Sequence, residues 1–195
     1  MVMDLETGGF NSNTDAILEM ASVTIRMDDD GTVYPGERQF FNVAPFEGAN
    51  IEEASLEFTG IDPGHPFRNE VSESTALTTT FDSIRKEMKQ TRCTRAILVA
   101  HNAAFDHAFI RQAVIRCGIK RSPFHPFSAF DTVSLGGLAV GQTVLAKACR
   151  ACGLEFDDQE AHTALYDCEK TAELFCYIVN RWQPLLDLTT SPDFI

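Results

Sequence analysis

The sequence begins MVMDLETGGF, in which one residue separates the acids Asp4 and Glu6. In a β-strand, residues i and i+2 project from the same face, about 6 to 7 Å apart. Two carboxylates placed in this way repel one another unless a cation lies between them. Mg²⁺ and Mn²⁺ prefer such hard oxygen ligands, so the pair indicates a divalent metal site. The alternative is a strand end that reaches solvent, where neighbouring acids cost little.

Two later segments carry acids at the ends of predicted elements. HNAAFD puts Asp106 in the first turn of an expected helix, where a carboxylate is favoured. HTALYD puts His162 just before the last expected helix and Asp167 just inside it. Taken singly, a helix-terminus acid, a cap residue and an exposed acid are the simpler interpretations. Taken together with Asp4 and Glu6, they predict one site of four carboxylates and an imidazole, provided that the strands before them are neighbours.

The elements that must position these residues follow from apolar patterns and turn signals. We expect strands over residues 1–5, 17–27 and 33–43, with a hairpin turn at Asp30-Gly31. A helix over 75–88, a buried strand over 95–101 and a helix capped by Asn102 come next. A short strand over 127–131, a short helix over 143–152 and a long helix over 162–182 complete the order. Three strands followed by alternating helices and strands predict an α/β mixed sheet, antiparallel at first and parallel later.

The composition is typical of a soluble globular protein. With 195 residues, 44% hydrophobic and 23% charged, we expect one domain over residues 1–195. The acids at positions 4 and 6 interrupt any signal peptide, and the uncharged stretch 132–146 is too short to span a membrane. Six dispersed cysteines with a single CxxC predict buried thiols in a reducing cytoplasm, rather than disulfides or a zinc site.

The charge is unevenly distributed along the chain. The formal net charge is −12, which by itself disfavours a polyanionic partner. Residues 85–121 nevertheless hold nine lysines and arginines against only Glu87 and Asp106. This segment predicts a basic surface on an acidic protein. Solvated helix faces explain the same pattern equally well.

The order and spacing of the acid-bearing motifs resemble one known family. DLET, HNAAFD and H-x-x-x-x-D resemble the three motifs of the DEDDh exonuclease superfamily. The segments FTGIDP, PFHPF, FDT and GQTVLAKAC are similar to the ribonuclease T family within it, so the resemblance extends from residue 4 to residue 167. It implies a ribonuclease-H-like fold, with a mixed five-stranded sheet flanked by helices. It also implies 3′–5′ hydrolysis of phosphodiester bonds.

The resemblance implies a two-metal site with a general base. Asp4 would bridge two Mg²⁺ ions, with Mn²⁺ as an alternative, while Glu6 and Asp167 complete the metal on the nucleophile side. Asp106 would hold the other metal through water. His162 is the one histidine of five with the superfamily spacing to Asp167, and its ordinary pKa near 6.5 suits a general base. These five residues are the expected catalytic set.

The resemblance also suggests where the substrate binds. Four of the fifteen phenylalanines are expected to stack on unpaired terminal bases, namely Phe10, Phe58, Phe105 and Phe127. We expect a homodimer in which the basic segment of one subunit holds RNA that feeds the other subunit's site. The residues expected to make this contact are Arg92, Arg95, Arg116 and Lys120. Arg116 lies about 15 Å along one helix from Asp106, which suits the body of the RNA rather than the scissile phosphate.

The implied substrates are the single-stranded 3′ ends of tRNA, rRNA and small stable RNA precursors, and also single-stranded DNA ends. The implied products are nucleoside 5′-monophosphates. We expect the protein to act in the cytoplasm without a membrane partner. Two alternatives stay open: another DEDDh activity, such as an oligoribonuclease or a proofreading subunit, and a silent nucleic-acid-binding module. The family pattern predicts a Glu four residues before Phe58, where this chain has Ala54 beside Glu53, so no terminal-base preference is implied. Only MVM precedes Asp4, which is short for a central strand and suggests further residues upstream.

Overall fold

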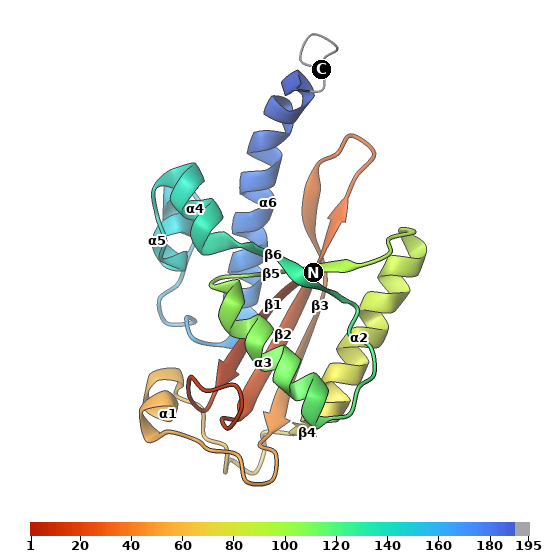
Figure 1. Cartoon of the computed structure of the whole chain (residues 1–195). Coiled ribbons are helices and arrows are strands. Elements are labelled where there is room, and N and C mark those ends of the chain that lie inside the picture. The colour runs from red at the N-terminus through yellow and green to blue at the C-terminus, as the bar shows by residue number, and fades with distance from the viewer. Residues whose placement is uncertain (190–195) are drawn as a thin grey trace.

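The computed structural model describes the backbone of residues 1–189 and the side chains of residues 1–183. A central sheet crosses the molecule, with α2 and α3 on one face and α6 on the other (Figure 1). The strands are β1 (Val2–Thr7), β2 (Ile17–Met27), β3 (Val33–Ala44), β4 (Val71–Ser72), β5 (Ala96–Ala100) and β6 (Phe124–Asp131). The helices are α1 (Glu53–Thr59), α2 (Glu73–Gln90), α3 (Ala103–Arg116), α4 (Thr132–Val140), α5 (Leu145–Ala151) and α6 (Ala164–Thr189).

The sheet has the strand order β4-β3-β2-β1-β5-β6. The first three strands run antiparallel, and β5 and β6 then add in parallel beside β1, which confirms the predicted change of direction. The sheet counts six strands rather than five, because β4 pairs two residues in parallel with the end of β3. Two residues are too few to give an alternating pattern in the sequence.

Two hydrophobic cores lie on the two faces of β1. Met3 and Leu5 pack with residues of α2 and α3, whereas Val2 packs with Ala164 and Cys168 of α6. Successive strand residues point to opposite faces. Asp4 therefore shares the face of Val2 and is directed toward α6. Because alternate residues of β1 point to opposite faces of the sheet, the acids of β1 are directed toward α6 and not toward α2 and α3.

Two helices were not predicted from the sequence. Helix α1 buries no side chain, so it has no apolar stripe to recognise. Helix α4 begins at the cap Asp131, whose side chain accepts the N–H of Val133 at 2.9 Å, and it contains two glycines that lower its helix propensity. A Cβ at Gly136 would lie 2.9 Å from the carbonyl oxygen of Gln142, so this position needs glycine for close packing.

Other expectations are corrected in detail. Asn102 precedes α3 as expected, but it has a left-handed φ of 70° and its side chain makes no cap hydrogen bond. The six cysteines are free thiols, although Cys93 is exposed and Cys117 and Cys152 are only partly buried. Among the described residues, no helix is both long enough and apolar enough to cross a membrane.

Candidate active site

The first two acids come from β1 and are directed toward the start of α6. Glu6 lies opposite Glu19 of the neighbouring strand β2, and Asp4 lies opposite Ala21. Both acids are partly buried. They occupy the C-terminal half of a central strand that β2 and β5 flank on its two sides. This position gives the carboxylates a rigid support.

Asp106 reaches the same place from α3. The helix leaves the end of β5, which runs parallel to β1, so its first turn lies beside the end of β1. The Asp106 side chain is buried, with 2% of the residue exposed. The backbone N–H groups of Asp106 and Leu5 donate to it. A helix N-terminus favours a carboxylate, and this explains how the acid tolerates burial.

His162 and Asp167 come from the start of α6. The backbone N–H of His162 donates to Asp167 Oδ2 at 3.1 Å, and His162 has a left-handed φ of 68°. Its imidazole is exposed and lies against the ring of Phe58, with 4.2 Å between the ring centroids. Asp167 Oδ1 is buried and has no hydrogen-bond partner among the described residues. A positive φ at a non-glycine residue is costly, and such strain is concentrated at functional sites.

We call Asp4, Glu6, Asp106 and Asp167 the acid cluster. Burial raises the pKa of Asp4 well above its usual range, and the negative charges of the other members and of Glu19 raise it further. Burial, with the charges of Asp167 and Glu19, raises the pKa of Glu6 to about 8. Burial also raises the pKa of Asp106 to about 8. Burial is thus the largest cause of all three raised pKa values, and neighbouring negative charges add to it.

The acid cluster fits divalent metal ions. Its donors are carboxylate oxygens, which Mg²⁺ and Mn²⁺ prefer, and the unpartnered Asp167 Oδ1 is a buried atom that a cation would satisfy. In the described part of the chain, no group of three or more His, Cys, Asp or Glu side chains is placed so that together they could hold a metal ion. The four acids share a neighbourhood, and a metal that keeps several waters does not need a closed protein cage.

Three of the four expected phenylalanines line one cavity beside the acid cluster. This cavity, the terminal pocket, measures about 380 Å³ and is lined by Glu6 together with Phe10, Phe58 and Phe105. Phe10 is 83% exposed, and its ring lies edge-on to Phe105 at 6.2 Å. Such an open apolar site of this size accommodates a small planar ligand. Ala54 and Glu52 also line this pocket. The family pattern predicts a Glu at position 54, and this chain has a methyl group there instead.

A buried acid holds the loop that presents Phe10. Asp15 accepts the N–H of Asn11 at 2.8 Å and the side-chain amide of Asn50 at 3.0 Å. A Cβ on Gly9 would lie 2.2 Å from Asp15 Oδ2, so only glycine allows this close approach. The glycines of DLETGGF therefore serve the loop geometry.

Phe127 lies in a different cavity. In the pairing of β5 with β6, the two-residue step from Ala96 to Leu98 is matched by the five-residue step from Phe124 to Ala129. The extra residues bulge outward, and Phe127 is 90% exposed. It lines a cavity of about 650 Å³, the basic pocket, together with Arg95, His107, Arg111, Arg121, Ser122, Phe124, His125 and Pro126.

The four predicted RNA-contacting cations do not lie together as a set. Arg92, Arg95 and Lys120 are exposed, but Arg116 is held within the molecule. Its guanidinium donates to both carboxylate oxygens of Glu73, at 3.1 and 2.7 Å, and to the Ser12 carbonyl at 3.0 Å. It also lies over the Phe46 ring. The structure therefore corrects the place of Arg116, because its donors are already used to join α3 to α2.

Sequence reasoning missed Glu19 of β2. Its carboxylate accepts the N–H of Ala164 at 3.2 Å, two residues after His162, and burial raises its pKa. It lies next to the acid cluster without belonging to the three motifs. The signal was present in the sequence, because Glu19 is the one acid in the otherwise apolar strand ILEMASV.

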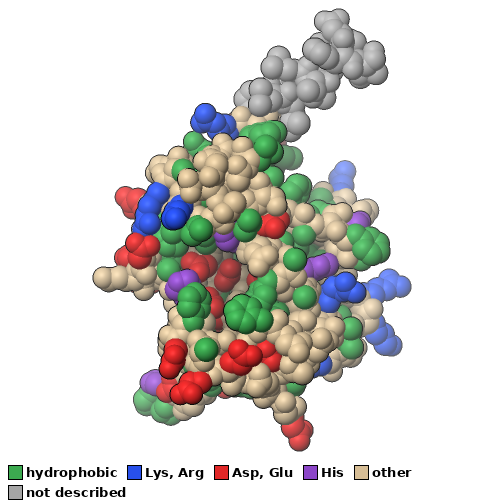
Figure 2. Space-filling model, turned by 60° about the vertical axis from the view of Figure 1, so that its left-hand side comes forward, with side chains coloured by type: hydrophobic (Ala, Val, Ile, Leu, Met, Phe, Trp, Pro, Cys, Tyr) green, Lys and Arg blue, Asp and Glu red, His purple; other side chains and the backbone are tan. Residues whose placement is uncertain are grey.

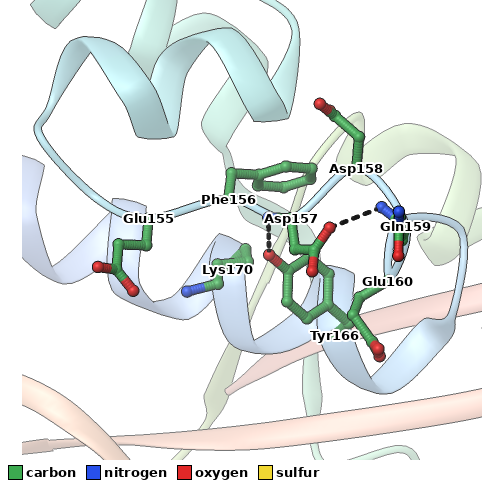
Figure 3. A pocket seen from close by; sticks show the side chains of 8 residues that line it. All are labelled: Glu155, Phe156, Asp157, Asp158, Gln159, Glu160, Tyr166 and Lys170. Atoms are coloured by element: carbon green, nitrogen blue, oxygen red, sulfur yellow. Dashed lines mark hydrogen bonds between the residues drawn. The ribbon is translucent and has the colours of Figure 1, made fainter.

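A further hollow lies where the loop before His162 packs on α6 (Figure 3). The Tyr166 hydroxyl accepts the N–H of Asp157 at 2.5 Å, and the Asp157 carboxylate accepts the N–H of Gln159 at 2.9 Å (Figure 3). The Phe156 ring lies edge-on to Tyr166 at 5.3 Å. Acids dominate this hollow, so it does not suit a polyanion. Its contacts hold the chain that leads to His162.

Figure 2 shows that the charges are segregated on one face of the molecule. Asp and Glu side chains lie inside a hollow with hydrophobic and His side chains at its rim, and Lys and Arg side chains gather at another edge (Figure 2). The net charge of −12 therefore does not describe the surface that a substrate would meet.

Comparisons with known proteins show the family of the chain. The exonuclease family model RNase_T matches residues 1–175. Ribonuclease T of Photorhabdus laumondii is 58% identical over 185 residues, which are 95% of this chain and 85% of that protein. Ribonuclease T of Vibrio cholerae is 59% identical over 186 residues, which are 95% of this chain and 83% of that protein.

Solved structures share the fold. Escherichia coli exonuclease I in complex with a dT13 oligonucleotide superposes with a TM-score of 0.70 at 19% identity, over 96% of this chain. The chain spans only 42% of that protein, so the likeness shows the fold alone. It confirms the predicted ribonuclease-H-like α/β class. With the family model and the relatives above, it leads to one conclusion: the chain belongs to the ribonuclease T family of 3′–5′ exoribonucleases.

Proposed function

We propose that this enzyme trims single-stranded 3′ ends of tRNA, rRNA and small stable RNA precursors, and also of single-stranded DNA, releasing nucleoside 5′-monophosphates. One observation carries the proposal. Glu6 of the acid cluster lines the same cavity as Phe10, Phe58 and Phe105. A terminal base held between these rings would bring its phosphate beside the carboxylates. Stacking on each base contributes about 1 to 3 kcal/mol and does not require a particular sequence.

The acid cluster is proposed to hold two Mg²⁺ ions, with Mn²⁺ as the alternative. Asp4, on which the charges of the other three acids act, would be shared by both ions, while Glu6 and Asp167 would hold one ion and Asp106 would hold the other. When bound, the metals supply charge stabilisation to the attacking and leaving oxygens. The acids would ionise on binding, since a cation would offset the burial and the repulsion that raise the pKa values of Asp4 and Glu6.

His162 is proposed as the general base that accepts the proton of the attacking water at its imidazole. The exposed ring is held beside Phe58, and its backbone N–H is bonded to Asp167. This arrangement supports a base of fixed position whose imidazole nitrogens are not metal ligands. The positive φ of His162 places the ring at the edge of the site.

The quaternary proposal is a homodimer in which Arg92, Arg95 and Lys120 of one subunit hold RNA that feeds the other subunit's site. Their exposure supports it, and Arg116 is withdrawn from the set because Glu73 already binds it.

We infer further that residues 1–195 form one exonuclease domain acting in the cytoplasm. Contacts of α6 with β1, β2 and β3 support a single unit, and free thiols in the described residues suit a reducing compartment.

The decisive assay measures release of mononucleotides from three substrates: a tRNA with a short 3′ overhang, a single-stranded nonamer and a blunt duplex. We expect divalent-metal-dependent release from the overhang, slower release from the blunt end, and no release with chelator. Cleavage confined to the nonamer would favour an oligoribonuclease. Tight binding without release in Mg²⁺ or Mn²⁺ would favour a silent nucleic-acid-binding module.

A further inference from the structure

The start of α6 is held by an acid from the sheet. The first amide of the helix, the N–H of Ala164, donates to Glu19 Oε2 of β2 at 3.2 Å. The hydroxyl of Thr163, the residue before the helix, donates to the Glu160 carbonyl at 2.9 Å. The first amides of a helix have no acceptor within it, so an acceptor from elsewhere must satisfy them. For Ala164, the sheet supplies that acceptor across 145 residues of sequence.

The same turn carries His162. The N–H of His162 donates to Asp167 Oδ2 at 3.1 Å, so two carboxylates hold this one turn. One carboxylate comes from α6 itself, and the other, Glu19, comes from the sheet. His162 has a left-handed φ of 68°, a conformation that a non-glycine residue keeps only where the surrounding contacts enforce it. The bond from Glu19 ties this turn to another element and so provides such a contact.

Glu19 also lies beside the acids of β1. It is directly opposite Glu6 in the pairing of β1 with β2, and directly opposite Asn42 in the pairing of β2 with β3. Side chains of directly opposite residues project from the same face, with Cβ atoms about 4.5 to 5.5 Å apart. Along the chain, Glu6 and His162 are far apart. Across the sheet, Glu19 alone connects the strand that bears two of the acids with the turn that bears the imidazole.

The strand beneath Glu19 is fixed by a buried cation. The Arg68 guanidinium donates to the carbonyl of Leu18, the residue before Glu19, at 2.5 Å, and it pairs with Glu70. The side-chain amide of Asn42 donates to the Arg68 carbonyl at 2.6 Å. Only 8% of the Arg68 side chain is exposed. Contacts of this kind keep a strand in place, and a residue that positions another group needs such support.

We propose that Glu19 is a positioning residue for the general base: by accepting the Ala164 N–H it fixes the start of α6, and through that start the imidazole of His162, relative to the acids of β1. This inference rests on the proposed function, in which His162 accepts the proton of the attacking water. Glu19 itself touches neither substrate nor metal in this arrangement. The competing role for the same side chain is a further carboxylate ligand of the metals.

The test compares Glu19→Ala, which removes the acceptor, with Glu19→Gln, which keeps a side-chain oxygen for the Ala164 N–H. The matched control is Ser72→Ala, because Ser72 caps α2 by accepting the N–H of Thr75 at 3.1 Å. Ser72 belongs to β4, which β3 and β2 separate from β1. Values of kcat and KM are measured at saturating Mg²⁺ on a tRNA with a 3′ overhang. Hydrogen exchange of the Ala164 amide is measured in EDTA, and thermal unfolding checks each variant's fold.

For Glu19→Ala we expect kcat to fall about 10- to 100-fold, the usual cost of losing a hydrogen bond that orients a group at a metal site, with KM unchanged and faster exchange of the Ala164 amide. Glu19→Gln should recover most of the kcat and of the protection, because its oxygen accepts the same N–H in a weaker bond. Ser72→Ala should keep the wild-type kcat. A wild-type kcat in Glu19→Ala would overturn the positioning role. A loss in Glu19→Gln as large as in Glu19→Ala would also overturn it, because the carboxylate charge rather than the acceptor would then matter.

A double variant asks whether the effect passes through His162. If Glu19 acts by placing this imidazole, Glu19→Ala combined with His162→Ala should have the kcat of His162→Ala alone, because no base is left to misplace. A further fall in kcat would overturn the inference, since Glu19 would then act on another group. Hydrogen exchange keeps the test independent of cleavage. If the wild-type chain releases no mononucleotide, the proposed function fails, while unchanged Ala164 protection in Glu19→Ala would overturn the inference even in an active enzyme.

Discussion

The acid cluster and the basic pocket lie on either side of the start of α3, and they handle charge in opposite ways. The acids are buried or partly buried, face one another and have raised pKa values. The arginines of the basic pocket are exposed and well hydrated. Burying like charges destabilises a folded chain, whereas exposing them costs little. Among the described residues, the acid cluster is therefore a place where bound cations would be stabilising, whereas the exposed arginines carry their charge at little cost.

We expect the largest effect from a substitution in the acid cluster. Asp4→Asn should reduce activity to less than a few per cent, because it removes the carboxylate that we propose is shared by the two metals. It should leave the metal-free fold as stable as before or more so, since one buried charge and its repulsion are lost. Single-turnover cleavage and thermal unfolding in EDTA measure the two effects. Asp29→Asn, in the exposed β2–β3 hairpin, is the control.

The next largest effect separates the chemical step from substrate and metal binding at the acid cluster. His162→Ala should lower kcat by about 10²- to 10⁴-fold, the usual contribution of a general base. Metal and RNA affinity should be preserved, because we propose that the side chain acts as a base rather than as a metal ligand. Partial recovery at higher pH is expected as hydroxide replaces the base. A calorimetric titration that shows lost metal binding would instead make His162 a ligand.

We expect a smaller effect from removing an aromatic ring from the terminal pocket or from the basic pocket. Phe58→Ala and Phe127→Ala should each reduce kcat/KM on a 3′ overhang by about 5- to 150-fold, through lost stacking. The control is Phe67→Ala, because Phe67 is 81% exposed but lines neither cavity. Blunt duplexes should be poor substrates throughout, since pairing occupies their bases. Equal wild-type rates on blunt and overhanging ends would contradict the role of these rings.

The smallest effect concerns pH and the metal-free protein. The pKa values of Glu6 and Asp106 are raised to about 8, from ordinary values of 4.5 and 3.8. Between those limits the folded chain binds more protons than the unfolded chain, so the free energy of unfolding falls as pH rises. In EDTA, Tm should therefore decrease from pH 5 to pH 8. Mg²⁺ should raise Tm more at pH 8 than at pH 5, and a flat profile would argue against mutual repulsion.

The sequence predicted the acid cluster because strand and helix periodicity decide which faces its residues occupy. Asp4 and Glu6 share a face by the two-residue period, and Asp106 and Asp167 begin helices that return to the same strand. These relations are local, so they can be read from spacing. The antiparallel and parallel halves of the sheet followed from the order of the elements for the same reason.

The sequence could not predict contacts that depend on tertiary packing. Arg116 appeared to be one of nine free cations, but Glu73 lies 43 positions earlier and only the packing of α3 on α2 brings them together. Glu19 meets Ala164 across 145 residues. Phe127 was grouped with Phe10, although a strand bulge directs it into another cavity. The sequence identifies charged and aromatic residues that could form a binding surface. Only the fold shows where on the molecule each of them lies.

The bulge of β6 has a consequence for the behaviour of the protein at high concentration. β6 is one edge of the sheet, and an unpaired edge can template pairing with a second molecule and start aggregation. The bulge interrupts the row of edge hydrogen-bonding groups, and Pro126 within it has no N–H to donate. The turn that exposes Phe127 thus also opposes pairing with a second molecule at this edge of the sheet.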